Sequence, residues 1–373
     1  MRSKTISEQL FFELLRAGLW EKEASLLPFE DDDLKDVYRI AEEQSVVGIV
    51  AAGLDHVKDV TVPKVELLQF VGQALQIEQQ NAAMNGFIRD LISLLRANEI
   101  YTLLVKGQGV AQCYEKPLWR SCGDIDLFLS DENYEKAKKL LIPKASSVEK
   151  ESLSSKHLGL TIDSWVVELH GLLYSSLSPR IFNILCDIKD DTFYRGNVRS
   201  WSNGTVQVFL LAAENDAVYI FTHFLGHFYK GGVGLRQICD WCRLLWTYRD
   251  VINESSLESR IRKAGLISEW KAFGSFAVNY LGMPSDAMPL YSDKAYWKAK
   301  ASLIHDFILD VGNFGHNRDT TFLGKKPYLI RKMIALGIRT ADFFRHARLF
   351  PMDTMRFFPI MIFNGLRSAV RGE

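Results

Sequence analysis

Two aspartates stand within one short apolar segment, and this pattern constrains the fold more than any other feature of the chain. The segment is Asp-Ile-Asp-Leu-Phe-Leu, from Asp124 to Leu129. Alternate side chains of a β-strand point to the same face, so Asp124 and Asp126 would project together, about 6.6 Å apart, with Ile125 directed into the core. Two adjacent carboxylates repel each other, and each loses solvation when it is buried. The segment therefore predicts a strand with an acidic face that requires cations.

Divalent cations would neutralise such a face. Mg²⁺ prefers oxygen ligands and is commonly held by one or two carboxylates together with substrate phosphates. A pair of such ions, roughly 3.5–4 Å apart, stabilises the attacking and leaving oxygens of a phosphoryl displacement. For an isolated triplet the ordinary interpretation is different: a strand that ends in solvent, with Asp124 as a turn residue. The surrounding sequence decides between the two.

The residues around the acidic segment alternate between helical and strand periodicity. Helical spacing is expected over residues 5–55 and again in one or two long helices over 62–100, the second from Gln80 to Asn98. Short strands and the helices between them are expected at 101–107, 110–116 (helix), 124–130, 131–141 (helix), 157–163 and 164–171, the last two as a hairpin. Two further strand-like pieces at 197–201 and 205–211 precede a mainly helical remainder.

This order predicts an α+β protein with a small mixed-sheet core flanked by N-terminal and C-terminal helical regions. The expected division is a helical region over residues 1–78, the core over 79–178 and a mainly helical region over 179–373. The composition agrees with a chain that buries a sizeable core, since 47% of the residues are hydrophobic and 24% are charged.

Charge, hydropathy and cysteine usage exclude several classes of protein. Lys plus Arg and Asp plus Glu both number 45, so the whole surface is not a platform for nucleic acid or membrane. No apolar run approaches the roughly 18–20 residues of a membrane span. The N-terminal residues carry acids within an apolar pattern and predict an amphipathic helix, not a signal peptide. Five scattered cysteines do not form a disulfide framework, which favours the cytoplasm.

Residues on both sides of the acidic segment favour a phosphate and metal site. Lys106 and Gly107 follow the first predicted strand and precede a short helix, a turn that brings backbone N–H groups close to a phosphate. Glu168 lies in an otherwise apolar strand and would supply a third carboxylate. Arg120 and Lys106 are candidate phosphate-binding cations. Solvated loop cations are the alternative interpretation of both.

Together these elements resemble the DNA polymerase beta-like nucleotidyltransferase superfamily. The segment from Leu103 to Leu129 is similar to bacterial proteins described only as uncharacterised nucleotidyltransferases, which have Lys-Gly after the first strand, an arginine before Gly-Asp-x-Asp-Leu, and an acid-Leu-His on a later strand. Val-Glu-Leu-His-Gly at 167–171 fits that last element. The resemblance covers most of the chain and is densest from Gln80 to Trp246.

The resemblance implies roles for particular residues. Asp124, Asp126 and Glu168 would be the catalytic metal ligands, with two Mg²⁺ ions expected and Mn²⁺ as a substitute. The nucleotide and its phosphates would be bound by Lys106, Gly107, Gln108, Arg120 and Gly123. Gln108 departs from the pattern, because the wider superfamily usually has a serine at this position, whose hydroxyl contacts a phosphate. This departure leaves the mode of phosphate binding open.

Several other residues are weaker candidates for the substrate side of the site. His170 shares the strand face of Glu168 and would orient it or contact substrate, with a structural histidine as the equal alternative. On the later helices the weak candidates are His223, Lys230, Arg236 and Asp240. Arg236 and Asp240 are also spaced as an exposed helical ion pair. His223, His227, Cys239 and Cys242 would offer tetrahedral zinc ligands, but helix packing is the favoured interpretation.

The sequence therefore predicts a Mg²⁺-dependent nucleotidyltransferase that moves a nucleoside monophosphate from an NTP to an acceptor hydroxyl. The acceptor is a small molecule, saccharide, protein or RNA. Two alternatives stay open: a nucleotide-binding or regulatory protein without transfer activity, and a toxin-like enzyme acting on RNA. The basic, aromatic-rich last 50 residues would suit RNA or a peripheral membrane contact, although an amphipathic helix packed on the body is favoured.

Overall fold

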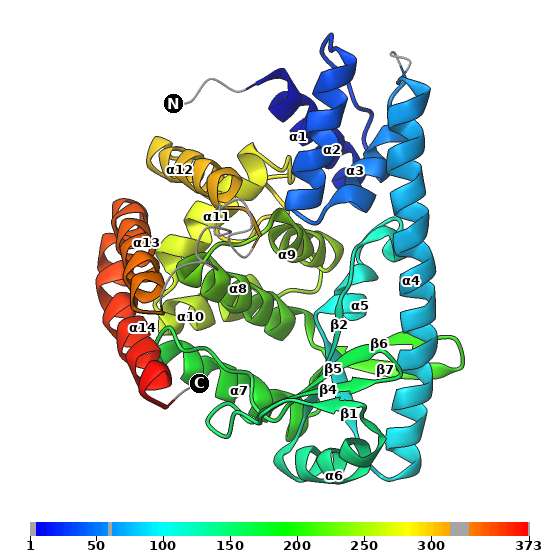
Figure 1. Ribbon diagram of the computed structural model, residues 1–373, viewed down its shortest axis with the longest axis vertical. Coiled ribbons are helices and arrows are strands. Elements are labelled where there is room, and N and C mark those ends of the chain that lie inside the picture. Colours follow the sequence, from blue (N-terminus) through cyan, green and yellow to red (C-terminus); the bar gives the residue numbers. More distant parts are fainter. Residues whose placement is uncertain (1–4, 59–61, 314–327, 372–373) are drawn as a thin grey trace.

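A computed structural model of the chain describes residues 5–58, 62–313 and 328–371. Within these ranges the protein is α+β, with one seven-stranded mixed sheet and helices packed on both of its faces (Figure 1). The predicted fold class is therefore confirmed.

The sheet places the acidic strand near its centre. The strands are β1 (Thr102–Val105), β2 (Asp124–Leu129), β3 (Ser147–Val148), β4 (His157–Ile162), β5 (Trp165–His170), β6 (Val198–Asn203) and β7 (Val206–Leu211). Their order is β3-β4-β5-β2-β1-β7-β6. The pairs β2–β5 and β1–β7 are parallel, and the other pairs are antiparallel. The hairpin β6–β7 thus extends the sheet beyond residue 178.

Helices precede, interrupt and follow the sheet. Those before it are α1 (Ile6–Trp20), α2 (Asp31–Glu43), α3 (Val47–Leu54) and α4 (Lys64–Ala97). Those between strands are α5 (Gly107–Ala111), α6 (Asp131–Leu141) and α7 (Pro179–Phe193), with 3-10 turns at Pro117–Trp119 and Ile142–Lys144. Those after it are α8 (Ala213–Lys230), α9 (Leu235–Thr247), α10 (Glu254–Ala264), α11 (Ile267–Asn279), α12 (Ala295–Val311), α13 (Tyr328–Leu349) and α14 (Pro351–Arg371).

The predicted strands at 101–107, 124–130, 157–163 and 164–171 are all present as β1, β2, β4 and β5. The long helical stretch is one continuous helix, α4, and not two. Figure 1 shows α4 running along the whole side of the molecule, from the N-terminal helices to the sheet. Ser130 caps α6 by accepting a hydrogen bond from the backbone N–H of Asn133.

The two faces of the sheet have different environments because the side chains alternate. The odd-numbered residues of β2 and β5, such as Ile125, Leu127 and Val167, pack against α4 and α6 in a smaller hydrophobic core. The opposite face carries Asp124, Asp126 and Glu168 toward the later helices. Phe128 continues that second face into the larger core, which includes residues of α7 and α8. The alternation therefore leaves the carboxylates between the sheet and the helical layer.

The C-terminal helices dock on this helical layer. Leu349, Phe350 and Phe357 are buried in the larger core, while Phe344 and Met352 are exposed. Part of the basic segment proposed for RNA or membrane contact, including Lys325 and Lys326, lies outside the described residues. Among the helices that the structure describes, none combines the length and apolarity needed to cross a membrane.

Candidate active site

The register of β2 and β5 brings three carboxylates together. Asp126 lies directly beside Glu168 across the parallel pair, and Asp124 is two residues away on the same face. One ligand oxygen from each of these residues lies within 4.8 Å of the others. The three acids that the sequence proposed as metal ligands therefore form one cluster.

The environments of these acids differ, so their pKa values diverge. Burial and the adjacent charge of Asp126 raise the pKa of Asp124. Burial also opposes the charge of Asp126, but Lys106 and His170 outweigh it and lower that pKa. The Oδ1 atom of Asp126 lies 2.9 Å from Lys106 Nζ and 2.7 Å from His170 Nε2. Hydrogen bonds from His157 and His170 lower the pKa of Glu168. The cluster is anionic, with Asp124 as its least neutralised member.

The turn after β1 has an unusual backbone. Lys106 has φ 57° and ψ −148°, a region that residues other than glycine rarely occupy. Gly107 follows with φ +44°, and a Cβ there would lie 3.2 Å from the Cys122 sulfur. This conformation directs the Lys106 side chain to Asp126 and starts α5 at Gly107. Such strain at a cluster of charged groups is typical of functional sites.

Gln108 has a structural role that the sequence did not reveal. Its Nε2 donates a hydrogen bond of 2.7 Å to Oδ1 of Asn81, and the side chain is only 1% exposed. Asn81, on α4, donates in turn to the carbonyl oxygens of Leu118 and Arg120. Gln108 thus joins α5 to α4 and the loop before β2, and its side chain does not take the place of a phosphate-binding hydroxyl.

Arg120 and Asp240 form a buried ion pair that corrects one sequence interpretation. Arg120 donates two hydrogen bonds to the Asp240 carboxylate, which also accepts one of 2.9 Å from Tyr114. Each partner is about 5% exposed. The predicted exposed ion pair of Arg236 with Asp240 is therefore wrong, because the Asp240 carboxylate is buried and paired with Arg120. Arg236 instead donates to the carbonyl oxygen of Ser121 at 2.7 Å.

A pocket of about 270 Å³ joins these groups. Its lining includes most of the residues proposed from the sequence: Lys106, Gly107, Arg120, Asp124, Asp126, Glu168, His223, Arg236 and Asp240, together with Val110, Ile220, His227 and Gln237. Four proposed residues are not in the lining: Gln108, Gly123, His170 and Lys230. His170 nevertheless contacts Asp126, which lines the pocket. The pocket thus has the three carboxylates on its strand side and the cations Lys106, Arg120 and Arg236 around them, with Asp240 paired to Arg120.

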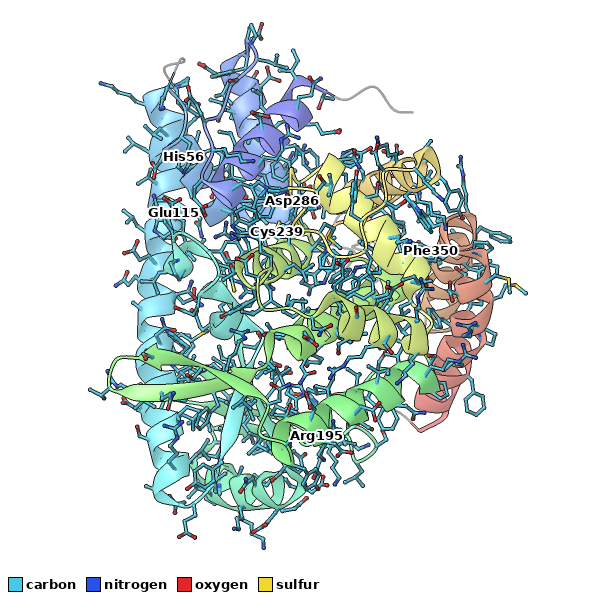
Figure 2. All side chains as sticks on the ribbon, turned by 180° about the vertical axis from the view of Figure 1, so that it is seen from behind. His56, Glu115, Arg195, Cys239, Asp286 and Phe350 are labelled. Carbon is cyan, nitrogen blue, oxygen red and sulfur yellow. The ribbon has the colours of Figure 1, made fainter. Side chains whose placement is uncertain are left out.

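The two histidines on α8 pair with each other. Their Nε2 atoms are 3.1 Å apart, so one ring donates to the other. Burial, followed by the charge of Lys106, lowers the pKa of His227 to about 4 and that of His223 well below its usual value. Cys239 and Cys242 are fully buried, and Figure 2 shows Cys239 in the interior of the molecule. Among the described residues, these four side chains do not form a group able to hold a metal ion, so the zinc interpretation is not supported.

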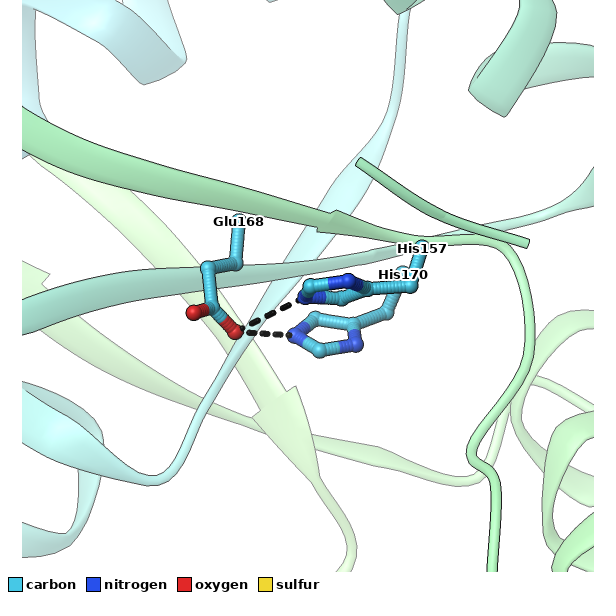
Figure 3. Close-up of side chains that lie close together, drawn as sticks. All are labelled: His157, Glu168 and His170. Carbon is cyan, nitrogen blue, oxygen red and sulfur yellow. Dashed lines mark hydrogen bonds and ion pairs between the residues drawn. The ribbon is translucent and has the colours of Figure 1, made fainter. Parts of the chain in front are cut away.

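His157 contacts the carboxylate cluster and was not among the residues proposed from the sequence. It opens β4 and stands opposite His170 across the hairpin, and its Nε2 lies 3.0 Å from Oε2 of Glu168 (Figure 3). The sequence contained the information needed to find it, because a two-residue turn at Asp163 and Ser164 fixes the register that pairs His157 with His170.

A family model described as uncharacterised nucleotidyltransferase matches residues 30–278, about two thirds of the chain. The protein belongs to this family. The matched range includes all of the sheet and the helices α8 and α9, and therefore every residue of the pocket lining. No curated protein and no solved structure matches the chain.

Proposed function

We propose that the protein transfers a nucleoside monophosphate from an NTP to an acceptor hydroxyl. The acceptor hydroxyl gives its proton to a carboxylate of the site or to water, and its oxygen forms a bond to the α-phosphorus. The bond from that phosphorus to the α–β bridging oxygen breaks, and pyrophosphate leaves with that electron pair. The observation that supports this reaction is the cluster of Asp124, Asp126 and Glu168 beside a pocket that also contains Lys106 and Arg236. The same arrangement favours kinship with the polymerase beta-like superfamily.

The donor set of the cluster fits Mg²⁺, which prefers oxygen ligands and binds through carboxylates and substrate phosphates. Asp124, Asp126 and Glu168 would hold one or two such ions, with Mn²⁺ as a substitute. When bound, the metal supplies Lewis-acid polarisation of the α-phosphate and neutralises the charge that develops on the leaving group. The raised pKa of Asp124 supports this assignment, since a bound cation would offset the burial and the repulsion from Asp126 that raise it.

The other groups of the pocket would position the triphosphate and the acceptor. Lys106 lies within reach of both Asp126 and an incoming phosphate, and the N–H groups at the start of α5 add donors. Arg236 lines the pocket and forms no ion pair with Asp240, so its guanidinium is the better arginine for a phosphate. The lowered pKa of Glu168 suits a metal ligand better than an acceptor of the hydroxyl proton.

Nucleotide binding without transfer is the second candidate. Asp126 already accepts contacts from Lys106 and His170 on the same oxygen, so the Lys106 cation and the hydrogen bond from His170 stabilise its charge without a metal. A protein that keeps this arrangement would bind an NTP through Lys106 and Arg236 and release no pyrophosphate.

One pair of measurements separates the two. Each of the four NTPs is tested with Mg²⁺ for a rise in melting temperature, because a ligand that binds only the folded state stabilises it. The best NTP is then incubated with Mg²⁺ and candidate acceptors while pyrophosphate release is measured. Release that disappears in Asp124→Asn supports transfer. Stabilisation without release across acceptor classes favours binding alone, and the absence of both contradicts a nucleotide site.

A further inference from the structure

A second group of metal-binding side chains lies beside the acidic cluster. His157, Glu168 and His170 offer two imidazole nitrogens and one carboxylate oxygen, all within 4.8 Å of one another. Figure 3 shows both rings directed at the same carboxylate: the Nε2 atoms of His157 and His170 lie 3.0 Å and 3.4 Å from Oε2 of Glu168. This donor set differs in chemistry from the all-oxygen cluster of Asp124, Asp126 and Glu168.

The strands hold the three donors in place. His157 of β4 is the direct partner of His170 of β5, and Glu168 is two residues from His170 on the same face. Antiparallel pairing places such side chains close together without any contribution from a loop. The ring centroids of the two histidines are 4.8 Å apart. The donors are therefore fixed by sheet register, which is the kind of rigid support that metal sites require.

An additional carboxylate lies beside this group. Gly159 is the partner of Glu168 on β4, on the same face of the sheet. A Cβ at Gly159 would lie 2.5 Å from Oε2 of Glu149, so the glutamate occupies the space that a side chain would fill. Glycine at this position leaves room for the Glu149 carboxylate over β4, opposite Glu168.

We infer that His157, Glu168 and His170 form a binding site for a divalent transition-metal ion, with Zn²⁺ as the best fit. Two imidazoles and one carboxylate, with further positions open, are a recognised ligand set for Zn²⁺ and related ions, and imidazole favours these metals over Mg²⁺. The side chains of His157 and Glu168 are 31% and 28% exposed, which gives an ion access from solvent. Because Glu168 belongs to both groups, an ion at one site changes the affinity of the other.

Direct metal binding tests this inference independently of nucleotidyl transfer. The full-length protein is freed of metal with a chelator and titrated with Co²⁺, whose visible absorption reports nitrogen ligands, and Zn²⁺ is then added to displace it. One Co²⁺ per chain is expected, and a large excess of Mg²⁺ should not remove it. In His157→Gln the affinity should fall by about 100-fold or more, since even loss of a supporting residue typically costs about 10–100-fold.

Two variants serve as controls. Asp124→Asn removes a ligand of the oxygen cluster only, so it should keep the Co²⁺ affinity within a few-fold of wild type while losing its response to Mg²⁺. His56→Gln removes a histidine whose Nε2 lies 3.4 Å from Oε2 of Glu115 (Figure 2). This pair contains one imidazole and one carboxylate, without the second histidine of the proposed site. It should bind Co²⁺ as the wild type does.

Two outcomes would overturn the site. Equal Co²⁺ binding by His157→Gln and wild type would place the ion elsewhere, and no stoichiometric binding by the wild type would leave the histidines as groups that only orient Glu168. Nuclear magnetic resonance of histidine rings in the wild type avoids any effect of the substitution on folding. Zn²⁺ should shift the ring signals of two histidines, and unchanged signals would contradict the inference.

Discussion

At the scale of single residues, Asp124 is a carboxyl group whose surroundings disfavour its charged form in the metal-free protein. Burial and Asp126 raise its pKa, so at neutral pH the folded state bears a cost that the unfolded state does not. The stability that protonated Asp124 contributes is therefore present at low pH, and it is lost as pH rises through the pKa of Asp124 in the folded protein.

Asp124→Asn should therefore leave the metal-free protein as stable as wild type at pH 7, or more stable. It should also abolish transfer and shrink the rise in melting temperature produced by Mg²⁺. Asp286→Asn makes the same chemical change at an exposed position outside the pocket and should behave as wild type. Wild-type turnover in Asp124→Asn would contradict the role of the cluster.

Lys106 competes with a metal for Asp126, and this gives a prediction of opposite sign for two ligands. Lys106→Met removes a cation 2.9 Å from the Asp126 carboxylate, so Mg²⁺ should bind more tightly. NTP should bind more weakly by about 1.5–3 kcal/mol, the usual value of a hydrogen bond to a charged group, and a nucleoside monophosphate should lose less. Isothermal titration of each ligand measures these changes.

The matched control for Lys106 is Lys138→Met, which breaks an ion pair with Glu151 at 2.7 Å on α6. It should leave Mg²⁺ and NTP binding unchanged. If Lys106→Met weakened the binding of NTP and monophosphate equally, Lys106 would not contact the distal phosphates.

At the scale of elements, the β4–β5 hairpin determines which side chains reach the site. Asp163 and Ser164 form its two-residue turn, both with positive φ of 48° and 70°. These values fit a type I′ turn, for which Asn-Gly is the preferred sequence. The turn sets the register that brings His157 next to Glu168.

The double substitution Asp163→Asn with Ser164→Gly should stabilise the protein by about 1 kcal/mol, because left-handed backbone is costly for residues other than glycine. Urea unfolding measures the gain. The metal and nucleotide responses should stay as in wild type, since the register is kept. Ser164→Pro is the counterpart: its fixed negative φ is incompatible with the turn, so it should destabilise the protein and reduce both responses together.

Local pattern explains why so much of the sheet was predictable. The apolar runs and the turn residues marked β1, β2, β4 and β5, and the acids of β2 and β5 pointed to the cluster. The role of Gln108 was not predictable, because its partner Asn81 is 27 positions away on α4 and only the fold brings them together. The same holds for the pairing of Arg120 with Asp240, which are 120 residues apart.

At the scale of the whole molecule, long-range hydrogen bonds join the N-terminal helices to the later ones. Gln44, fully buried after α2, accepts from the backbone N–H of Leu235 and donates to the carbonyl oxygen of Ile308. Arg243 of α9 donates to the carbonyl oxygens of Leu19 and Cys113. These bonds join the N-terminal helices and the segment after α5 to α9 and α12, so the position of α9, which carries Arg236 and Asp240, depends on contacts outside the sheet.

A buried acid links three of these helices and makes stability depend on pH. Glu269 of α11 is fully buried and accepts a hydrogen bond of 3.2 Å from Tyr229 of α8. Burial and the charge of Asp353, on α14, raise the pKa of Glu269 to about 8. Asp353 is itself paired with Arg356 at 3.2 Å. The folded protein therefore holds a proton on Glu269 that the unfolded chain, with an ordinary glutamate pKa near 4.3, would release.

The sign of the effect follows from this raised pKa. The stability that Glu269 contributes as a neutral acid is fully present below about pH 4.3 and is lost as pH rises toward about 8. Glu269→Gln keeps a neutral side chain at every pH, so its melting temperature should exceed that of wild type by an amount that is small at pH 4.5 and largest at pH 8 and above. Glu132→Gln, at an exposed position on α6, should show no such trend. Melting curves of the three proteins from pH 4.5 to 9 provide the test, and a difference between Glu269→Gln and wild type that does not grow with pH would mean that Glu269 is already ionised in the folded protein.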